Sequence, residues 1–284
     1  MSAARHFQRI MCVSLLMAIV AGGFWGQAAA KADVLELVPA QSLVVVRVNQ
    51  FDTSLAQVDK FLAGLAPIPV QMAVKAKLGE ILGSAEVKGV DMNGDFAAFL
   101  VAGESYGSDM PPMYPGVLIP ISNYDQFIKG NPNCAAPDEN GVSAMSGGPG
   151  LIVIQAGSHA LVTMGKLRPQ VLQYQEALDT GGLVAIESMA SRLAAADAKA
   201  AGQVPVWVYG NVAQASNVFK PLLEDKFDQF KGTIAEMIKQ ESPQGQIMDI
   251  GMFLNMYGAM LEMIMDQTQS LSLAIIPQPD VLRI

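Results

Sequence analysis

The sequence predicts an α+β fold in which antiparallel sheets are covered by helices. Short β-branched runs, the first of them LVVVRV at 43–48, alternate with the period of two that half-buried strands show. The segments that follow such runs carry apolar residues at helical spacing instead. Turn signals between apolar runs, at Asn93-Gly94 and within 151–164, indicate hairpins and therefore antiparallel neighbours.

The chain opens its folded part with a strand and two helices. Val44, Val46 and Val48 share one side of the strand, and Arg47 points to the other side. Asp52 or Thr53 is a suitable N-cap for the helix that follows. A second helix then ends at Gly83, a residue that readily adopts the left-handed conformation found after helices.

The remainder of the first unit, to residue 202, alternates the same two kinds of element. The hairpin turns around Gly157 and His159, and Pro169 suits the first turn of a helix. Strands are predicted at 94–103 and 116–122, a hairpin at 151–164, and helices at 124–130, 169–178 and 187–200.

A second unit, predicted over 203–284, repeats the opening strand and helix. A shift of 160 positions without a gap aligns six identical residues in 19, most of them valines of the strands. The aligned pairs are Val44/Val204, Val46/Val206, Val48/Val208, Val58/Val218, Lys60/Lys220 and Leu62/Leu222. Either an internal duplication or two unrelated units with the same apolar pattern explains this match. The second unit stops at Ile284, four residues into a predicted strand, so we expect a truncated unit or a strand that completes the first sheet.

The N-terminus, 1–32, has the three parts of an export signal. Arg5 and Arg9 precede an uncharged, mostly apolar run from Ile10 to Trp25, and small residues follow, with Ala30 and Ala32 as candidate cleavage positions. A transmembrane anchor is the rival interpretation, but a span needs about 20 apolar residues. We therefore expect a periplasmic or extracellular protein with no stable membrane span after cleavage.

Charge and composition limit the partners of the exported chain. Removal of 1–32 leaves 15 Lys and Arg against 26 Asp and Glu, a net charge of −11. Such a chain repels phosphate backbones, so nucleic acid is not an expected partner. Hydrophobic residues make up 51% of the sequence, which is enough for a packed core and far from the composition of disordered chains.

Few side chains of the exported chain suit catalysis. Cys134 is its one cysteine, a loop thiol that could also form an intermolecular disulfide or react. His159 is its one histidine, which we expect to be a solvated turn residue, because no nucleophile motif accompanies it. A single histidine and cysteine make no zinc cluster, so neither a metal nor another cofactor is expected.

Two other patterns resemble binding motifs but fail in detail. The run from Asp91 to Asp95 begins like a calcium loop, yet Phe96 and Ala102 occupy the positions where glycine and glutamate are needed, so a turn carrying carboxylates is the simpler interpretation. The loop 146–150 is glycine-rich, but it precedes a strand and not the helix that would hold a phosphate.

A methionine stripe is the most unusual feature of the second unit. Thioethers spaced by about four residues share one face of a predicted helix, and they comprise Met248, Met252, Met256, Met260 and Met263. The stripe has three interpretations: core packing, an adaptable groove for a lipid or peptide, or soft ligands for Cu(I). We take these methionines as the candidate ligand-binding residues.

The chain also resembles a group of exported bacterial proteins of unknown function. The resemblance rests on VPAQSLVVVRVNQF at 38–51, on GDFAAFL, on VLIPISNYDQFIKGNP and on the hairpin at 151–164. Such proteins open, after their signal, with Pro-Ala-Asp-Ser/Thr and a strand, and Gln41 stands where their acidic residue is usual. The resemblance covers 37–215 and implies an α+β fold with repeated antiparallel sheets, with no assigned reaction and no site residues to carry over.

These observations favour a non-catalytic envelope protein that binds an envelope protein or lipid, or another apolar ligand. The rival function is a hydrolase that acts on an envelope polymer with carboxylates alone. Candidate carboxylates for that reaction are Glu104, Asp109, Glu224 and Asp225, all of which also suit a charged surface.

Overall fold

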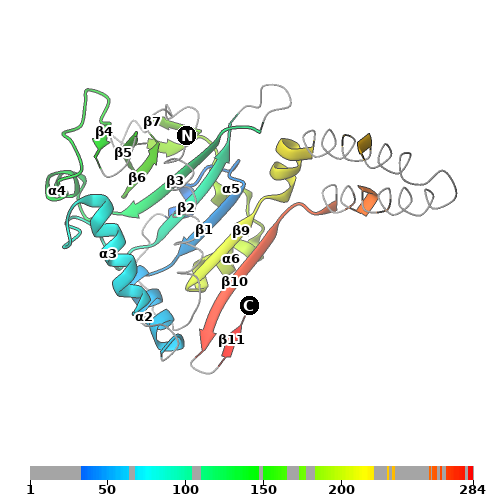
Figure 1. Cartoon of the computed structure of the whole chain (residues 1–284), viewed down its shortest axis with the longest axis horizontal. Helices are drawn as coiled ribbons and strands as arrows, with labels where there is room; N and C mark the ends of the chain where they lie inside the picture. Colours follow the sequence, from blue (N-terminus) through cyan, green and yellow to red (C-terminus); the bar gives the residue numbers. More distant parts are fainter. Residues whose placement is uncertain are drawn as a thin grey trace. The chain divides into compact units, whose positions relative to one another are not determined.

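The computed structural model is an α+β fold built on antiparallel strands, as the sequence predicts (Figure 1). It describes residues 33–63, 68–103, 110–146, 150–164, 173–176, 183–220, 229, 232–233, 256, 258–260, 263, 267–278 and 281–283. The signal-like segment 1–32 and the predicted helix at 169–178 lie largely or wholly outside these residues, as do Met248 and Met252.

One large sheet organises the described residues. Its strand order is β11-β10-β9-β1-β2-β3-β6-β5-β4, and two short strands, β7 (Tyr174–Glu176) and β8 (Leu183–Ala185), pair separately. The nine strands of the large sheet are β1 (Val44–Val48), β2 (Phe96–Ala102), β3 (Met113–Pro120), β4 (Ser143–Met145), β5 (Leu151–Ala156), β6 (His159–Met164), β9 (Val206–Gly210), β10 (Leu271–Gln278) and β11 (Val281–Arg283). The predicted hairpin at 151–164 is confirmed as β5 and β6, which pair antiparallel.

Strand β1 shows how the two sheet faces differ. It pairs antiparallel with β2, with Val44 opposite Leu100 and Val48 opposite Phe96. Side chains alternate along a strand, so Val44 and Val48 share one face and Arg47 lies on the other. The strand is half-buried, as predicted, but the face of Arg47 is the more deeply buried one, and Val44 is exposed.

Three helices pack on the sheet face that carries Val48. They are α2 (Phe51–Phe61), α3 (Val70–Leu82) and α4 (Tyr124–Gly130). Helix α2 begins one residue before the predicted caps, because Gln50 precedes it with a positive φ of 44°. Gly83 ends α3 in the left-handed conformation, as predicted, and Asn123 caps α4 by accepting a hydrogen bond from the Gln126 N–H.

The opposite face is covered by η1 (Val34–Glu36), α5 (Met189–Arg192) and α6 (Ala195–Gln203). The helix predicted over 187–200 is divided in two, because Leu193 and Ala194 are extended between α5 and α6. Trp207 of β9 is fully buried in the core under these helices and stacks on Tyr209, with ring centroids 5.4 Å apart.

The described residues divide into two compact units. One unit takes in those within 1–101, 114–209 and 272–284, and the other those within 102–113 and 210–271. The predicted boundary at 202/203 stays a prediction, because much of the second segment lies outside the described residues. Within the part of the chain that the structure describes, no helix is both long and apolar enough to cross a bilayer.

Candidate functional site

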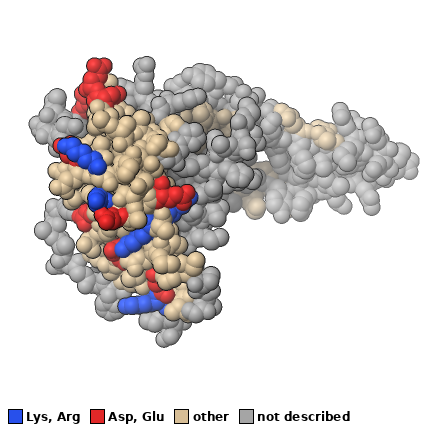
Figure 2. Space-filling view, turned by 60° about the vertical axis from the view of Figure 1, so that its left-hand side comes forward, with Lys and Arg blue, Asp and Glu red and all other residues tan. Residues whose placement is uncertain are grey.

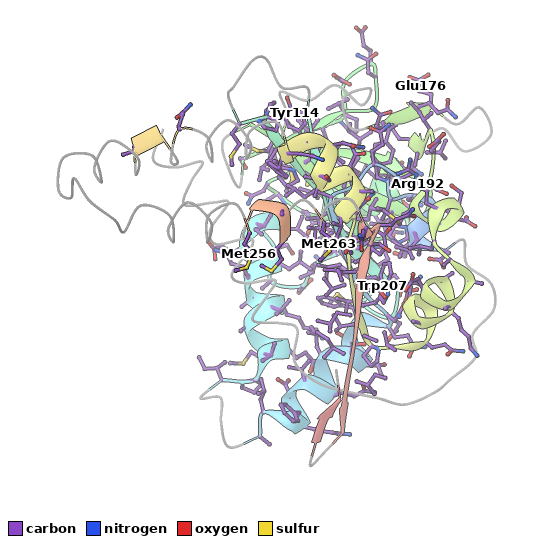
Figure 3. All side chains as sticks on the ribbon, turned by 90° about the vertical axis from the view of Figure 1, so that its right-hand side faces the viewer. Tyr114, Glu176, Arg192, Trp207, Met256 and Met263 are labelled. Atoms are coloured by element: carbon purple, nitrogen blue, oxygen red, sulfur yellow. The ribbon has the colours of Figure 1, made fainter. Side chains whose placement is uncertain are left out.

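The three described methionines of the stripe lie at the surface. Met256, Met260 and Met263 are in helical conformation, with 59%, 45% and 51% of their area exposed. Figure 3 labels Met256 and Met263. Spacings of four and three residues place the three side chains on one helical face. The other two predicted site residues, Met248 and Met252, lie outside the described residues.

This exposure bears on the three interpretations of the stripe. Core packing requires that the thioethers be removed from water, and burial of apolar area stabilises a fold by about 25 cal/mol per Å². The three described methionines forgo much of that stabilisation. An exposed row of flexible, polarizable side chains is instead suited to contact with an apolar partner, which would remove the thioethers from water.

A second cluster surrounds the buried Arg47 of β1. Its Nη1 donates to Asp33 Oδ1 at 2.6 Å, its Nη2 to Asp95 Oδ2 at 2.8 Å, and its Nε to Asn49 Oδ1 at 2.5 Å. The second Asp95 oxygen accepts from the Gln50 N–H at 2.9 Å. The guanidinium thus joins the segment before η1, the β1 strand and the start of β2 by charge-assisted hydrogen bonds.

The same cluster extends toward α6 through Asn49. The side-chain amide of Asn49 donates to the carbonyl of Ala201 at 2.7 Å and to that of Val204 at 2.5 Å. Asn49 therefore accepts from Arg47 on one side and anchors the end of α6 on the other. These contacts join segments of the fold around the buried Arg47 side chain.

His159 lies inside the fold, so the prediction of a solvated turn residue is wrong. The turn residues before it, Gly157 and Ser158, take the exposed positions, while His159 is the first residue of β6 and only 4% exposed. Its Nε2 lies 3.0 Å from the Asp95 backbone carbonyl, and its Nδ1 lies 3.2 Å from Ser158 Oγ. Strand pairing opposite Pro120 and Ala156 accounts for this burial.

The neighbours of His159 do not form a catalytic triad, although they include a serine and an aspartate. A triad needs a carboxylate that orients the imidazole and a hydroxyl on the opposite ring nitrogen. Here Asp95 offers its carbonyl to the ring, while its carboxylate is held by Arg47. The Ser158 hydroxyl belongs to an exposed turn residue and lies beside the ring of its own neighbour. The geometry is that of a satisfied core histidine.

The carboxylates of Asp33 and Asp95 are bound by Arg47 and do not form the free pair that a hydrolase needs. Such a pair requires one carboxyl that holds a proton and one that is free to act as base or nucleophile. Asp33 and Asp95 both pair with the Arg47 guanidinium, at 2.6 Å and 2.8 Å. Glu104, Asp109, Glu224 and Asp225 lie outside the described residues.

Asp91 forms a turn, as the sequence predicts, while the role of the Cys134 thiol stays a prediction. Asp91 accepts through Oδ1 from the Asn93 N–H and through its carbonyl from the Gly94 N–H, which closes a turn before β2. Burial raises the pKa of the Cys134 thiol to about 11, which favours its protonated form at neutral pH. Across the described residues, no group of three or more His, Cys, Asp and Glu side chains could hold a metal ion.

Two apolar surfaces were not identified from the sequence. One is a groove of about 840 Å³ along α3. The other is the pair of exposed leucines on β10, Leu271 and Leu273, of which Leu271 is 65% exposed. Period and composition identify apolar elements but do not say which of their faces the rest of the chain leaves uncovered.

The chain matches no protein-family model, no curated protein and no solved structure. Its function must therefore be inferred from these surfaces.

Proposed function

We propose that this is an exported, non-catalytic envelope protein that binds a protein or an apolar ligand through its methionine stripe. The observation that carries the proposal is the exposure of Met256, Met260 and Met263 on one helical face. Methionine is unbranched and adapts its shape to a partner, so a row of thioethers suits acyl chains or an amphipathic peptide better than a polar ligand.

The polar cluster supports the non-catalytic part of the proposal. Arg47, Asp33 and Asp95 are engaged with one another, and His159 faces a carbonyl, so these groups serve structure. The pairing of Asp33 and Asp95 with Arg47 leaves neither carboxylate free for the rival hydrolase. Export rests on the basic, apolar and small-residue parts of 1–32, which direct the chain to the periplasm or the exterior.

The strand order supports an internal duplication as part of this proposal. β1 and β9 are neighbours in the sheet, β2 lies beyond β1, and β10 lies beyond β9. Helical residues follow β1 and also follow β9, at 212–220, before the next strand of the sheet. The order is thus symmetric about the β1–β9 pair, which is the arrangement that two copies of one strand–helix–strand unit would produce.

A titration with a fluorescent fatty-acid analogue tests the binding proposal. The variant replaces Met256, Met260 and Met263 by glutamine, which keeps the length and helix propensity of the side chain but makes it polar. We expect the triple variant to bind the probe at least about tenfold more weakly, because apolar contact is lost at three neighbouring positions.

Met110→Gln is the matched control, since Met110 is also exposed but lies outside the stripe. It should leave the affinity unchanged. If the triple variant and the control bind the probe as tightly as the parent chain, or if the parent chain binds neither the probe nor an amphipathic peptide, the proposal is wrong.

A further inference from the structure

The methionine stripe exposes a reactive group as well as an apolar surface. Met256, Met260 and Met263 are exposed, so dissolved peroxides can reach their thioethers. Met145 and Met189, by contrast, are buried in the two hydrophobic cores. A peroxide should therefore convert the stripe before these core methionines, and the core should stay packed while the stripe changes.

The thiol of Cys134 competes weakly with these thioethers for a peroxide. Cys134 is the one cysteine outside the signal-like segment 1–32. Peroxides react with the thiolate far faster than with the thiol, and burial raises the pKa of this group to about 11, which favours the thiol at neutral pH. A thioether has no proton to lose, so its oxidation needs no such ionisation. The exposed methionines are therefore the sulfur groups that should respond first.

Oxidation would turn the apolar face of the stripe polar. The thioether sulfur attacks the outer oxygen of a hydroperoxide, an S–O bond forms as the O–O bond breaks, and the proton passes to the departing oxygen. Sulfur loses two electrons and the peroxide gains them, so it leaves as an alcohol or, from hydrogen peroxide, as water. Each methionine thereby changes from an apolar to a polar side chain. Spacings of four and three residues bring three such changes to one surface.

The exposed Met72 of α3 lies in a different setting. Its helical neighbour Lys75, three residues further on, pairs with Asp52 at 2.9 Å. Figure 2, which turns the α2–α3 side forward, shows Lys, Arg, Asp and Glu side chains scattered over that surface. One sulfoxide adds little polarity to a surface that is already charged, so oxidation of Met72 should matter less than oxidation of the stripe.

We propose that Met256, Met260 and Met263 form a reversible oxidation site that switches off binding at the stripe. The inference rests on the proposed function, because it assigns regulation to the same surface. A hydroperoxide converts the thioethers to sulfoxides, and the apolar partner is released. Methionine sulfoxide reductases reverse the change: a dithiol becomes a disulfide, and the sulfoxide oxygen leaves as water. Leucine at these positions would be as apolar and as favourable to a helix, but it could not be oxidised.

Titration of the full chain before and after treatment with hydrogen peroxide tests this switch. The probes are the fluorescent fatty-acid analogue and an amphipathic peptide, and peroxide is removed before they are added. We expect the affinity to fall at least about tenfold, as in the glutamine variant, and to recover after incubation with dithiothreitol and the reductases for both sulfoxide epimers. Peptide mass spectrometry should find oxygen on the stripe but not on Met189, which excludes unfolding as the cause.

Leucine variants separate the switch from the binding itself. Replacement of Met256, Met260 and Met263 by leucine conserves volume and apolar character, so this variant should bind within about threefold of the parent chain and keep that affinity after peroxide. The matched control, Met72→Leu with Met110→Leu, removes two exposed methionines outside the stripe and should lose affinity after peroxide as the parent chain does.

The outcomes distinguish failure of the switch from failure of the proposed function. An oxidised parent chain that binds as tightly as the reduced chain would overturn the switch and leave the proposed function standing. So would a leucine variant of the stripe that loses its affinity after peroxide, or a control that keeps it. A reduced parent chain that binds neither probe would overturn the proposed function, and the switch with it.

Discussion

Arg47 is the residue on which the described polar contacts converge. Its guanidinium binds two carboxylates and an amide, and the side chain itself is buried. Removing one partner of a buried ion pair leaves the other charges uncompensated, which is more costly than the pair's net contribution.

Arg47→Met should therefore lower the free energy of unfolding by about 2–4 kcal/mol, measured by urea denaturation. We expect a value in the lower part of the range for losing one partner of a buried ion pair, because the side chains of Asp33 and Asp95 are partly exposed. Adding Asp33→Asn and Asp95→Asn to this variant should recover part of the loss. A change below about 0.5 kcal/mol for Arg47→Met would show that the cluster is not structural.

The Cys134 thiol gives a pH-dependent test. Burial raises its pKa to about 11 from an ordinary value of 9.0, so the folded state holds the proton more tightly than the unfolded state. The thiol's contribution to stability is therefore complete below pH 9 and is lost as the pH rises through 11. Alkylation by iodoacetamide should show a midpoint near 11 in the folded chain and near 9.0 in urea. Equal midpoints would contradict the burial.

At the scale of elements, the sequence predicts whether a segment is a helix or a strand better than it predicts which of its faces is buried. The apolar period identifies β1, α2, α3, α4 and the β5–β6 hairpin, because local alternation and capping decide whether a segment is strand or helix. It does not reveal that the Arg47 side of β1 is the more buried, because that depends on η1 and α6, which come from distant parts of the chain. For the same reason, the sequence does not predict that His159 is buried.

The candidate site was predictable in part for a similar reason. The spacing of the methionines places Met256, Met260 and Met263 together, as the sequence indicates, but the spacing of apolar residues is the same in a core helix and in an exposed binding face. Only the surrounding chain decides between them. Predicting the α3 groove requires more than the spacing of apolar residues, because the groove depends on how residues 83–85 fold back over Gly79.

The end of α3 offers a test of one element. Gly83 has a φ of 76°, and a Cβ there would lie 2.7 Å from Asn133 Oδ1. Gly83→Ala should lower the free energy of unfolding by about 1–3 kcal/mol, from backbone strain and a steric clash together. Gly141→Ala isolates the strain, because Gly141 has a φ of 72° and open space around its Cβ position. Equal losses for the two variants would refute the clash.

At the scale of the whole molecule, the proposed export would determine which partners the protein can meet. N-terminal sequencing of the mature protein should find Lys31 or Asp33 as its first residue. Ala30→Glu removes a small residue that both cleavage positions require, so the precursor should accumulate, while Ala29→Glu should still be processed. A precursor that keeps its first 32 residues in the parent chain would instead indicate an anchored protein.

The most direct test of the central claim is the rate at which the stripe methionines are oxidised. Sulfoxide formation at Met256, Met260 and Met263 can be followed by peptide mass spectrometry, with the exposed Met110 as the internal standard. We predict rates close to that of Met110 in the purified chain, and protection of the three stripe methionines but not of Met110 in intact envelopes. Slow oxidation in the purified chain, or equal oxidation of all four in the envelope, would contradict an exposed face that a partner covers.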